Sequence, residues 1–139
     1  MKRKFVDAHM KVAEIYANLS SARRLKVGCV IVKNDTIIGI GYNGMPSGWD
    51  NNCETYVSSV EELVTKPEVI HAESNALSKI ARSTNSSEQS DMFITHAPCL
   101  QCAKLIFQSG IRKVFYHEEY RDDGGVEFLK KCGVEIEKV

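Results

Sequence analysis

The sequence predicts an α/β domain of three layers, in which helices cover both faces of a five-stranded mixed sheet. Strand-like and helix-like segments alternate through the second half of the chain, which favours parallel strands joined by helices. Earlier in the chain, two apolar runs flank Asn34-Asp35, an arrangement typical of an antiparallel hairpin. A chain of 139 residues suits one domain, so we expect residues 1–139 to form a single folding unit.

The first half of the chain begins with a predicted helix over 5–19, where apolar residues recur at helical spacing. Two buried strands follow over 27–32 and 36–40, because both runs are continuously apolar. Glycine, asparagine and proline dominate 41–67, so we expect mainly one long loop there, in which 57–64 can form one or two helical turns. A loop of this length inside a small domain is usually functional or mobile.

The second half of the chain contains three further helices and three further strands. Pro98 is well placed to begin one of these helices and Gly110 to end it. The complete order of elements is therefore αββαβαβαβ. The predicted segments are a helix over 69–81, a strand over 92–95, a helix over 98–110, a strand over 113–116, a helix over 126–131 and a strand over 134–137.

Charge and cysteine content exclude some classes of protein. The chain has 18 Lys and Arg residues and 18 Asp and Glu residues, so its formal net charge is zero. Binding of long nucleic acid normally requires an excess of basic residues or a basic face. The chain begins without the continuous apolar core of a signal peptide, and no later run reaches transmembrane length. Five cysteines, an odd number, favour free thiols in a reducing compartment. We therefore expect a cytoplasmic protein with neither a membrane nor long nucleic acid as partner.

Two short motifs, each at the start of a predicted helix, carry the chemistry. Cys99 and Cys102 lie three residues apart on a first helical turn, so both sulfurs point the same way, and the positive end of the helix dipole favours their thiolates. His71 at the head of the neighbouring helix completes three zinc ligands. A three-ligand site leaves the fourth tetrahedral position for water, which is the arrangement of catalytic zinc.

Charge explains why Glu73 belongs to the same site. Two thiolates cancel the formal charge of Zn²⁺, so its water is acidified less than at a three-histidine site and a nearby base becomes more necessary. Glu73, two residues after His71, fits that requirement. An H-x-E motif followed by P-C-x-x-C is the signature of zinc nucleobase deaminases, in which Glu is the general acid/base and not a ligand.

Two alternative interpretations of the cysteines remain open at this point. Cys99 and Cys102 can form a redox dithiol, or they can belong to a structural zinc site with four protein ligands. The fourth ligand would then be one of the other three cysteines, Cys29, Cys53 or Cys132. Neither alternative gives Glu73 a role.

Beyond these motifs, the chain resembles the deoxycytidylate (dCMP) deaminases of bacteria and bacteriophages, within the cytidine deaminase superfamily. The resemblance lies in R-L-K-V-G-C-V-I-V over 24–32, G-Y-N-G-M-P-S-G over 41–48, H-A-E-S-N-A over 71–76 and Y-R-D over 120–122. It implies the cytidine deaminase-like fold, a three-layer α/β/α arrangement. Ala22 departs from the pattern, because family members often have a cysteine there and several of those bind a second, structural zinc. A second zinc of that kind is therefore not expected here, and Cys53 is interpreted as its remnant.

The resemblance implies hydrolysis of dCMP to dUMP and ammonia, which supplies dUMP for thymidylate synthesis. Glu73 would take a proton from water and pass protons to the base. Two of the implied contacts have plainer explanations, since Arg24 can be an ordinary solvated charge and Asn43-Gly44 is good turn chemistry. The implied site consists of one Zn²⁺ held by His71, Cys99 and Cys102, phosphate and sugar contacts from Arg24, Asn43 and Tyr120, and backbone contacts to the base amine around Ala97.

The resemblance also implies regulation and assembly. Many relatives are homohexamers activated by dCTP and inhibited by dTTP, and their effector site includes positions that correspond to Gly41, Tyr42, Gly44 and Asn75. Mg²⁺ would accompany such a triphosphate. The rival functions are a deaminase of both dCMP and dCTP, a tRNA adenosine deaminase, and a zinc-stabilised binding module without catalysis. For a viral protein, the expected location is the host cytoplasm.

Overall fold

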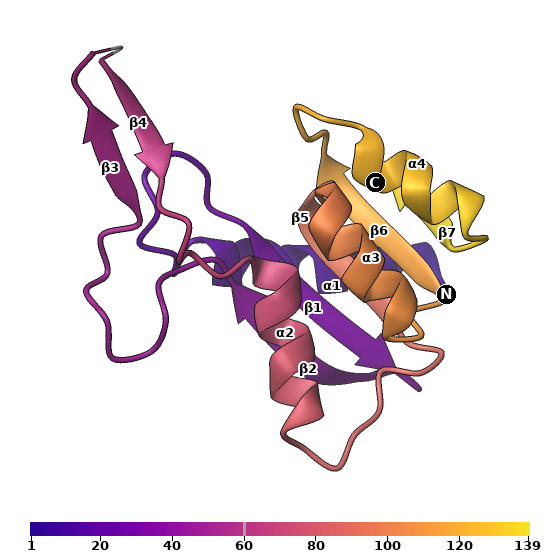
Figure 1. The fold of residues 1–139 in the computed structure, drawn as a ribbon. Helices are drawn as coiled ribbons and strands as arrows, with labels where there is room; N and C mark the ends of the chain where they lie inside the picture. The colour runs from indigo at the N-terminus through magenta and orange to yellow at the C-terminus, as the bar shows by residue number, and fades with distance from the viewer. Residues whose placement is uncertain (60) are drawn as a thin grey trace.

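A five-stranded mixed sheet forms the centre of the structure, a computed structural model that describes residues 1–59 and 61–139 (Figure 1). The strand order is β2-β1-β5-β6-β7. Strand β1 runs antiparallel to both β2 and β5, whereas β5, β6 and β7 are parallel to one another. This arrangement confirms the predicted mixed sheet. The strands are β1 (Gly28–Lys33), β2 (Thr36–Tyr42), β5 (Asp91–His96), β6 (Lys113–Glu118) and β7 (Glu135–Lys138).

Four helices cover the sheet and complete the three layers (Figure 1). Helix α1 (Arg3–Ala17) packs on one face, where Val6, Met10 and Ala13 meet Phe93 and Phe115. The opposite face carries α2 (Ala72–Ala81), α3 (Leu100–Gln108) and α4 (Gly124–Lys131), whose apolar residues share one core with β1, β5 and β6. The α2–α4 face also carries the two motifs that were singled out in the sequence.

The turn between β1 and β2 has the backbone that its residues predict. Asn34 and Asp35 have φ angles of 50° and 61°, the left-handed values required at both central positions of a type I′ turn. Asn and Asp tolerate this conformation better than other residues with a side chain. The hairpin prediction is therefore confirmed.

The segment expected to be a long loop contains a second hairpin, so the prediction of helical turns over 57–64 is wrong. Strands β3 (Glu54–Val57) and β4 (Glu62–Thr65) pair with each other in a separate two-stranded sheet that extends away from the main body (Figure 1). Val60, within the segment predicted as helical, lies outside the described residues. The short E-T-Y-V and E-L-V-T segments are rich in residues of high β propensity, which favours strands over helix.

The helices that carry the motifs begin later than predicted. Ile70 forms an isolated antiparallel bridge with Gly44, with N···O distances of 2.8 and 3.1 Å, and this bridge keeps the chain before His71 extended. Helix α2 therefore begins at Ala72 with His71 as its N-cap. Helix α3 begins at Leu100 with Cys99 as its N-cap, one residue after Pro98. Both N-caps are predicted metal ligands.

Among the described residues, no helix combines the length and the apolar character that a membrane span requires.

Candidate functional site

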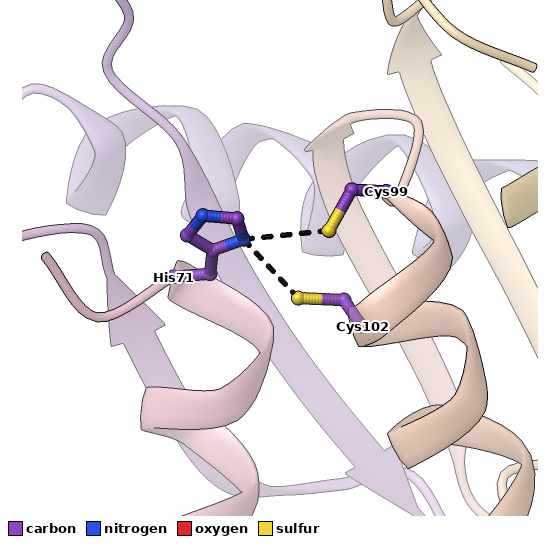
Figure 2. A group of neighbouring side chains, drawn as sticks. All are labelled: His71, Cys99 and Cys102. Atoms are coloured by element: carbon purple, nitrogen blue, oxygen red, sulfur yellow. Dashed lines mark hydrogen bonds between the residues drawn. The ribbon is translucent and has the colours of Figure 1, made fainter. Parts of the chain in front are cut away.

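The first turns of α2 and α3 bring three predicted ligands together (Figure 2). His71 Nδ1 lies 3.3 Å from the Cys102 sulfur and 3.6 Å from the Cys99 sulfur. His71 and Cys99 are N-caps with extended backbone, and Cys102 lies in the first turn of α3. The geometry arises because α2 and α3 lie side by side on one face of the sheet, so that their N-terminal ends meet above β1 and β5 (Figure 2).

These three donors fit a zinc ion. Their ligand atoms all lie within 4.8 Å of one another, and one imidazole nitrogen with two thiolate sulfurs is a donor set that zinc prefers. No other cluster of this kind occurs among the residues that the structure describes. Cys29, Cys53 and Cys132 therefore lie outside the donor cluster, and the arrangement is that of an open three-ligand site rather than a closed four-ligand one. Cys29 is fully buried in the core.

The environment of the two thiols favours metal binding. The pKa of Cys99 falls to about 4, because Cys102 and His71 hydrogen-bond to its thiolate and together outweigh the effect of burial. The pKa of Cys102 is raised, first by the neighbouring Cys99 thiolate and then by its own burial. One thiolate is therefore already present near neutral pH, and the second thiol must lose its proton when a metal binds.

Glu73 lies next to this trio in the first turn of α2, and it is 4% exposed. Burial raises the pKa of its carboxyl to about 7, although its own backbone N–H and the nearby His71 act in the opposite direction. A carboxyl that titrates near neutral pH can both accept and return a proton, which suits a general acid/base. Glu73 is not among the clustered donors, so it remains available for proton transfer.

A cavity of about 660 Å³ opens beside these residues. Its size fits a nucleotide or another small molecule. The cavity brings together residues from distant parts of the chain that the sequence analysis had singled out. Its lining includes His71, Glu73, Cys99, Arg24, Asn43, Ala97 and Tyr120.

Arg24 lines the cavity on the segment between α1 and β1. Its guanidinium donates a hydrogen bond to Thr65 Oγ1 at 3.2 Å. Among the described residues, no carboxylate lies within ion-pair distance of this guanidinium, whereas Arg23 pairs with Glu54. Arg24 therefore presents a positive charge to the cavity that its neighbours do not neutralise.

Asn43 uses its side chain to hold the segment that contains Arg24. Its Oδ1 accepts a hydrogen bond from the Val27 N–H at 2.9 Å, and its Nδ2 donates one to the Leu25 carbonyl at 2.8 Å. The side chain thus does more than favour a turn. One amide hydrogen and one oxygen lone pair remain available for a ligand.

Ala97 and Tyr120 line the cavity just beyond the C-terminal ends of β5 and β6. The Ala97 N–H donates to the Glu118 carbonyl at 2.8 Å, which leaves the Ala97 carbonyl as the backbone group suited to an amine. Tyr120 packs against the cluster formed by Ala97, Tyr116 and Val126. Tyr120 therefore packs against the core and lines the cavity at the same time.

The four residues predicted as effector contacts do not line this cavity. Gly41 packs against α2, where a Cβ atom would collide with the Ala72 carbonyl oxygen and lie 2.6 Å from the Ala76 nitrogen. Asn75 donates from Nδ2 to the Tyr42 carbonyl at 3.0 Å, and Gly44 forms the bridge to Ile70. These contacts tie the end of β2 and the residue Gly44 beyond it to α2 and to the segment just before α2, so they help to hold the helix that carries His71 and Glu73.

The contribution of the second hairpin to the cavity is not predicted by the sequence. Glu54 from β3 and Val64 and Thr65 from β4 line it, and Glu54 is buried although it is charged. Alternating polar and β-branched residues over 54–57 were the available signal for a strand. Nothing in the local pattern distinguishes Glu54 from a solvated glutamate, because its partners lie about thirty residues earlier in the chain.

The chain is similar to several known proteins. The family model described as the cytidine and deoxycytidylate deaminase zinc-binding region matches residues 3–118. The deoxycytidylate deaminase of Enterobacteria phage T2 is 32% identical over 91% of this chain and 88% of its own. The human deoxycytidylate deaminase is 38% identical over 81% of this chain and 65% of its own. A crystal structure of the dCMP deaminase from cyanophage S-TIM5 in complex with dCMP and dUMP has a TM-score of 0.92 and 44% identity, and the match covers 100% of this chain and 99% of that one.

Proposed function

The chain belongs to the cytidine and deoxycytidylate deaminase family, and we propose on this basis that it is a zinc-dependent dCMP deaminase that hydrolyses dCMP to dUMP and ammonia. The observation that carries the proposal is the position of the His71, Cys99 and Cys102 donors and the buried Glu73 beside a nucleotide-sized cavity. The likeness to a structure that contains dCMP and dUMP supports this substrate and product. The product would supply thymidylate synthesis, in the cytoplasm or, for a viral protein, in the host cytoplasm.

His71, Cys99 and Cys102 would hold one Zn²⁺ per chain. Zinc bound there would supply Lewis acidity, which makes a water molecule a better nucleophile at neutral pH. The burial of the three donors differs, since Cys102 is buried whereas His71 is exposed on the side of the cavity. A substrate would therefore approach the site from the side of His71.

Glu73 would move the protons in the reaction. As water adds to C4 of cytosine and the C4–O bond forms, Glu73 accepts one proton and delivers it to N3, which makes C4 more electrophilic. Glu73 then transfers the second proton of the water to the exocyclic amine, the C4–N bond breaks, and ammonia leaves behind a carbonyl at C4. Water and dCMP are thus converted into dUMP and ammonia with no other reactant.

The remaining cavity residues would bind and orient the nucleotide. The Arg24 guanidinium is suited to bind phosphate oxygens through two hydrogen bonds. Asn43 would offer its remaining amide capacity to the sugar hydroxyl, and Tyr120 would contact the sugar or phosphate. The Ala97 carbonyl would accept a hydrogen bond from the base amine. Binding the distant phosphate in this way holds C4 in place for attack.

Regulation by dCTP as activator and dTTP as inhibitor is part of the proposal, with Mg²⁺ on the triphosphate. All four predicted effector residues lie outside the cavity, with Gly41 and Tyr42 at the end of β2, Gly44 just after that strand and Asn75 on α2, so an effector bound there would act on the helix that carries His71 and Glu73. An effector can shift activity only if it binds one conformation of this region more tightly than another.

A homo-oligomer, most simply a hexamer, is also part of the proposal. The outer face of helix α1 and the turn that follows it expose large apolar side chains, with Phe5 46%, Ile15 63% and Leu19 58% exposed. Monomeric proteins rarely leave large apolar patches in water, so this face supports contact between copies. Size-exclusion chromatography with light scattering measures the assembly. A monomer at all concentrations would contradict this part of the proposal.

The experiment that tests the function is a steady-state assay of ammonia release from dCMP, dCTP and deoxycytidine, each with and without dCTP or dTTP as effector. We expect turnover of dCMP, with sigmoidal kinetics that dCTP relieves. Turnover of dCTP as well would indicate the broader deaminase. Activity on tRNA but not on dCMP, or zinc binding without turnover of any of these, would overturn the proposal in favour of the tRNA adenosine deaminase or the binding module.

A further inference from the structure

Glu54 is a buried carboxylate in the wall of the cavity to which the sequence assigns no role. Its side chain is 1% exposed, and it begins β3 at the base of the second hairpin, opposite Thr65 of β4. A buried charge costs several kcal/mol unless hydrogen bonds and an opposite charge compensate it. The position of Glu54 therefore calls for specific partners.

Those partners are two consecutive arginines. Glu54 Oε2 accepts hydrogen bonds from the backbone N–H groups of Arg23 at 2.9 Å and Arg24 at 3.0 Å. Glu54 Oε1 lies 3.4 Å from Arg23 Nε, which adds an ion pair. Although burial alone would raise the pKa of Glu54, the N–H groups of Arg24 and Arg23 and the Arg23 guanidinium hold it below its usual value. Glu54 is thus an ionised anchor for this segment.

The anchor separates the two arginines into different roles. The Arg23 guanidinium is engaged by Glu54 and by Asn52 Oδ1 at 2.9 Å. The Arg24 backbone is fixed by the same carboxylate, but its guanidinium extends to Thr65 and lines the cavity. Asn43 holds Leu25 and Val27, so the chain is fastened on both sides of the Arg24 side chain.

We propose that Glu54 is a positioning residue for the substrate phosphate, because it fixes the backbone of Arg24 and engages the side chain of Arg23, so that Arg24, and not Arg23, presents its guanidinium to the anion. This inference rests on the proposed function, in which Arg24 binds the phosphate of dCMP. Binding of a nucleoside without phosphate does not depend on Glu54. A guanidinium held in place by a fixed backbone loses less conformational freedom when it binds an anion.

Glu54→Gln tests the proposal, because it keeps the size of the side chain but replaces one acceptor oxygen with a donor that faces N–H groups. We expect KM for dCMP to rise about tenfold, the size of one hydrogen bond to a charged group, with little change in kcat. Turnover of deoxycytidine should stay as in the wild-type protein. Equal losses on dCMP and deoxycytidine would overturn the proposal.

Asp91→Asn is the matched control. Asp91 is also a buried carboxylate, 7% exposed, and it is paired with an exposed arginine through Arg112 Nε at 2.9 Å. It begins β5, whereas Ala97 follows the opposite end of that strand, and it does not line the cavity. Its loss should lower stability in a thermal melt without changing KM for dCMP. A similar rise of KM in Asp91→Asn would mean that general destabilisation explains the effect of Glu54→Gln.

A double-mutant cycle shows whether Glu54 acts through Arg24. In an Arg24→Ala background, Glu54→Gln should cause no further rise of KM for dCMP, whereas independent effects would multiply and contradict the proposal. If Glu54→Gln fails to fold, Arg23→Gln removes the guanidinium contacts with Glu54 and Asn52 but keeps the backbone N–H bond to Glu54, and it should raise KM for dCMP more weakly, again with no effect on deoxycytidine. If the wild-type protein does not deaminate dCMP, the proposed function itself is wrong. If the wild-type protein is active but Glu54→Gln affects dCMP and deoxycytidine equally, only this inference is wrong.

Discussion

The Nδ1 atom of His71 lies 3.3 Å from the sulfur of Cys102, although the two residues are 31 positions apart in the chain. Only the adjacent packing of α2 and α3 creates this proximity. Because the two side chains and Cys99 present donors of the kind that zinc prefers, the relationship leads to a prediction about metal content.

We expect the purified protein to contain one zinc per chain, measured by elemental mass spectrometry. Cys102→Ala should reduce the zinc content severely, because it removes one of only three protein ligands. Cys132→Ala is the control, since this cysteine lies outside the donor cluster and its loss should leave zinc in place. Loss of zinc in both variants would favour a structural site with four protein ligands.

Glu73→Gln should retain zinc and nucleotide binding but lose turnover by a factor of about 10² to 10⁴, because the amide cannot accept and return a proton. Single-turnover measurement of ammonia release checks this. The control is Glu119→Gln, which changes an exposed carboxylate of the same cavity that pairs with Lys138. Near-normal turnover of Glu73→Gln would remove Glu73 from the reaction.

Arg24→Ala should reduce kcat/KM for dCMP about a hundredfold, because two hydrogen bonds to a charged phosphate are lost. Turnover of deoxycytidine, which has no phosphate, should change little. Lys26→Ala removes an exposed cation two residues along the chain that does not line the cavity, and it should leave both substrates unaffected. If Arg24→Ala impairs both substrates equally, Arg24 does not bind the phosphate.

The pKa of Glu54 is lowered in the folded protein, so its ionised form stabilises the fold. A lowered pKa contributes stability above the ordinary value of 4.5, and this contribution is lost as the pH falls toward and through the folded pKa. We therefore expect the free energy of unfolding to fall below about pH 4.5, and to fall less steeply in Glu54→Gln. Urea unfolding between pH 3 and pH 7 measures it, and identical slopes for both proteins would contradict the assignment.

Gly41→Ala should destabilise the protein by about 1–3 kcal/mol and weaken zinc binding, because the added methyl group would push α2 away from β2. Gly44→Ala is a matched control, since a Cβ atom at Gly44 has no neighbour within 4 Å among the described residues. Thermal melts with and without zinc compare the two. Equal stability of both variants would show that the contact between Gly41 and α2 is not tight in solution.

The sequence predicted the main sheet and its helices because apolar periodicity is a local signal. The turn at Asn34-Asp35 followed from backbone preferences, and the cluster of His71, Cys99 and Cys102 followed from two motifs at predicted helix starts. The start of α2 was placed too early, because the bridge between Gly44 and Ile70 joins residues that local pattern cannot connect.

The second hairpin and the burial of Glu54 could not be predicted in the same way. Each strand of the hairpin has four residues, and the main-chain partners of Glu54 lie thirty and thirty-one positions away. The bonds from the side chain of Asn43 to Leu25 and Val27 were likewise not predicted, although they leave the expected contact with a sugar open. Such long-range hydrogen bonds depend on the folded chain as a whole.

His71 and Cys99 each begin a helix without providing the side-chain hydrogen bond that usually satisfies the first backbone N–H groups. Their side chains instead converge on the donor cluster. We therefore expect a bound ion to join these two helix ends and to slow their local opening. The rate of hydrogen exchange at the first-turn amides of α2 and α3 would then depend on whether a metal ion is bound. A single measurement would report both the stability of these helix ends and the metal occupancy of the site.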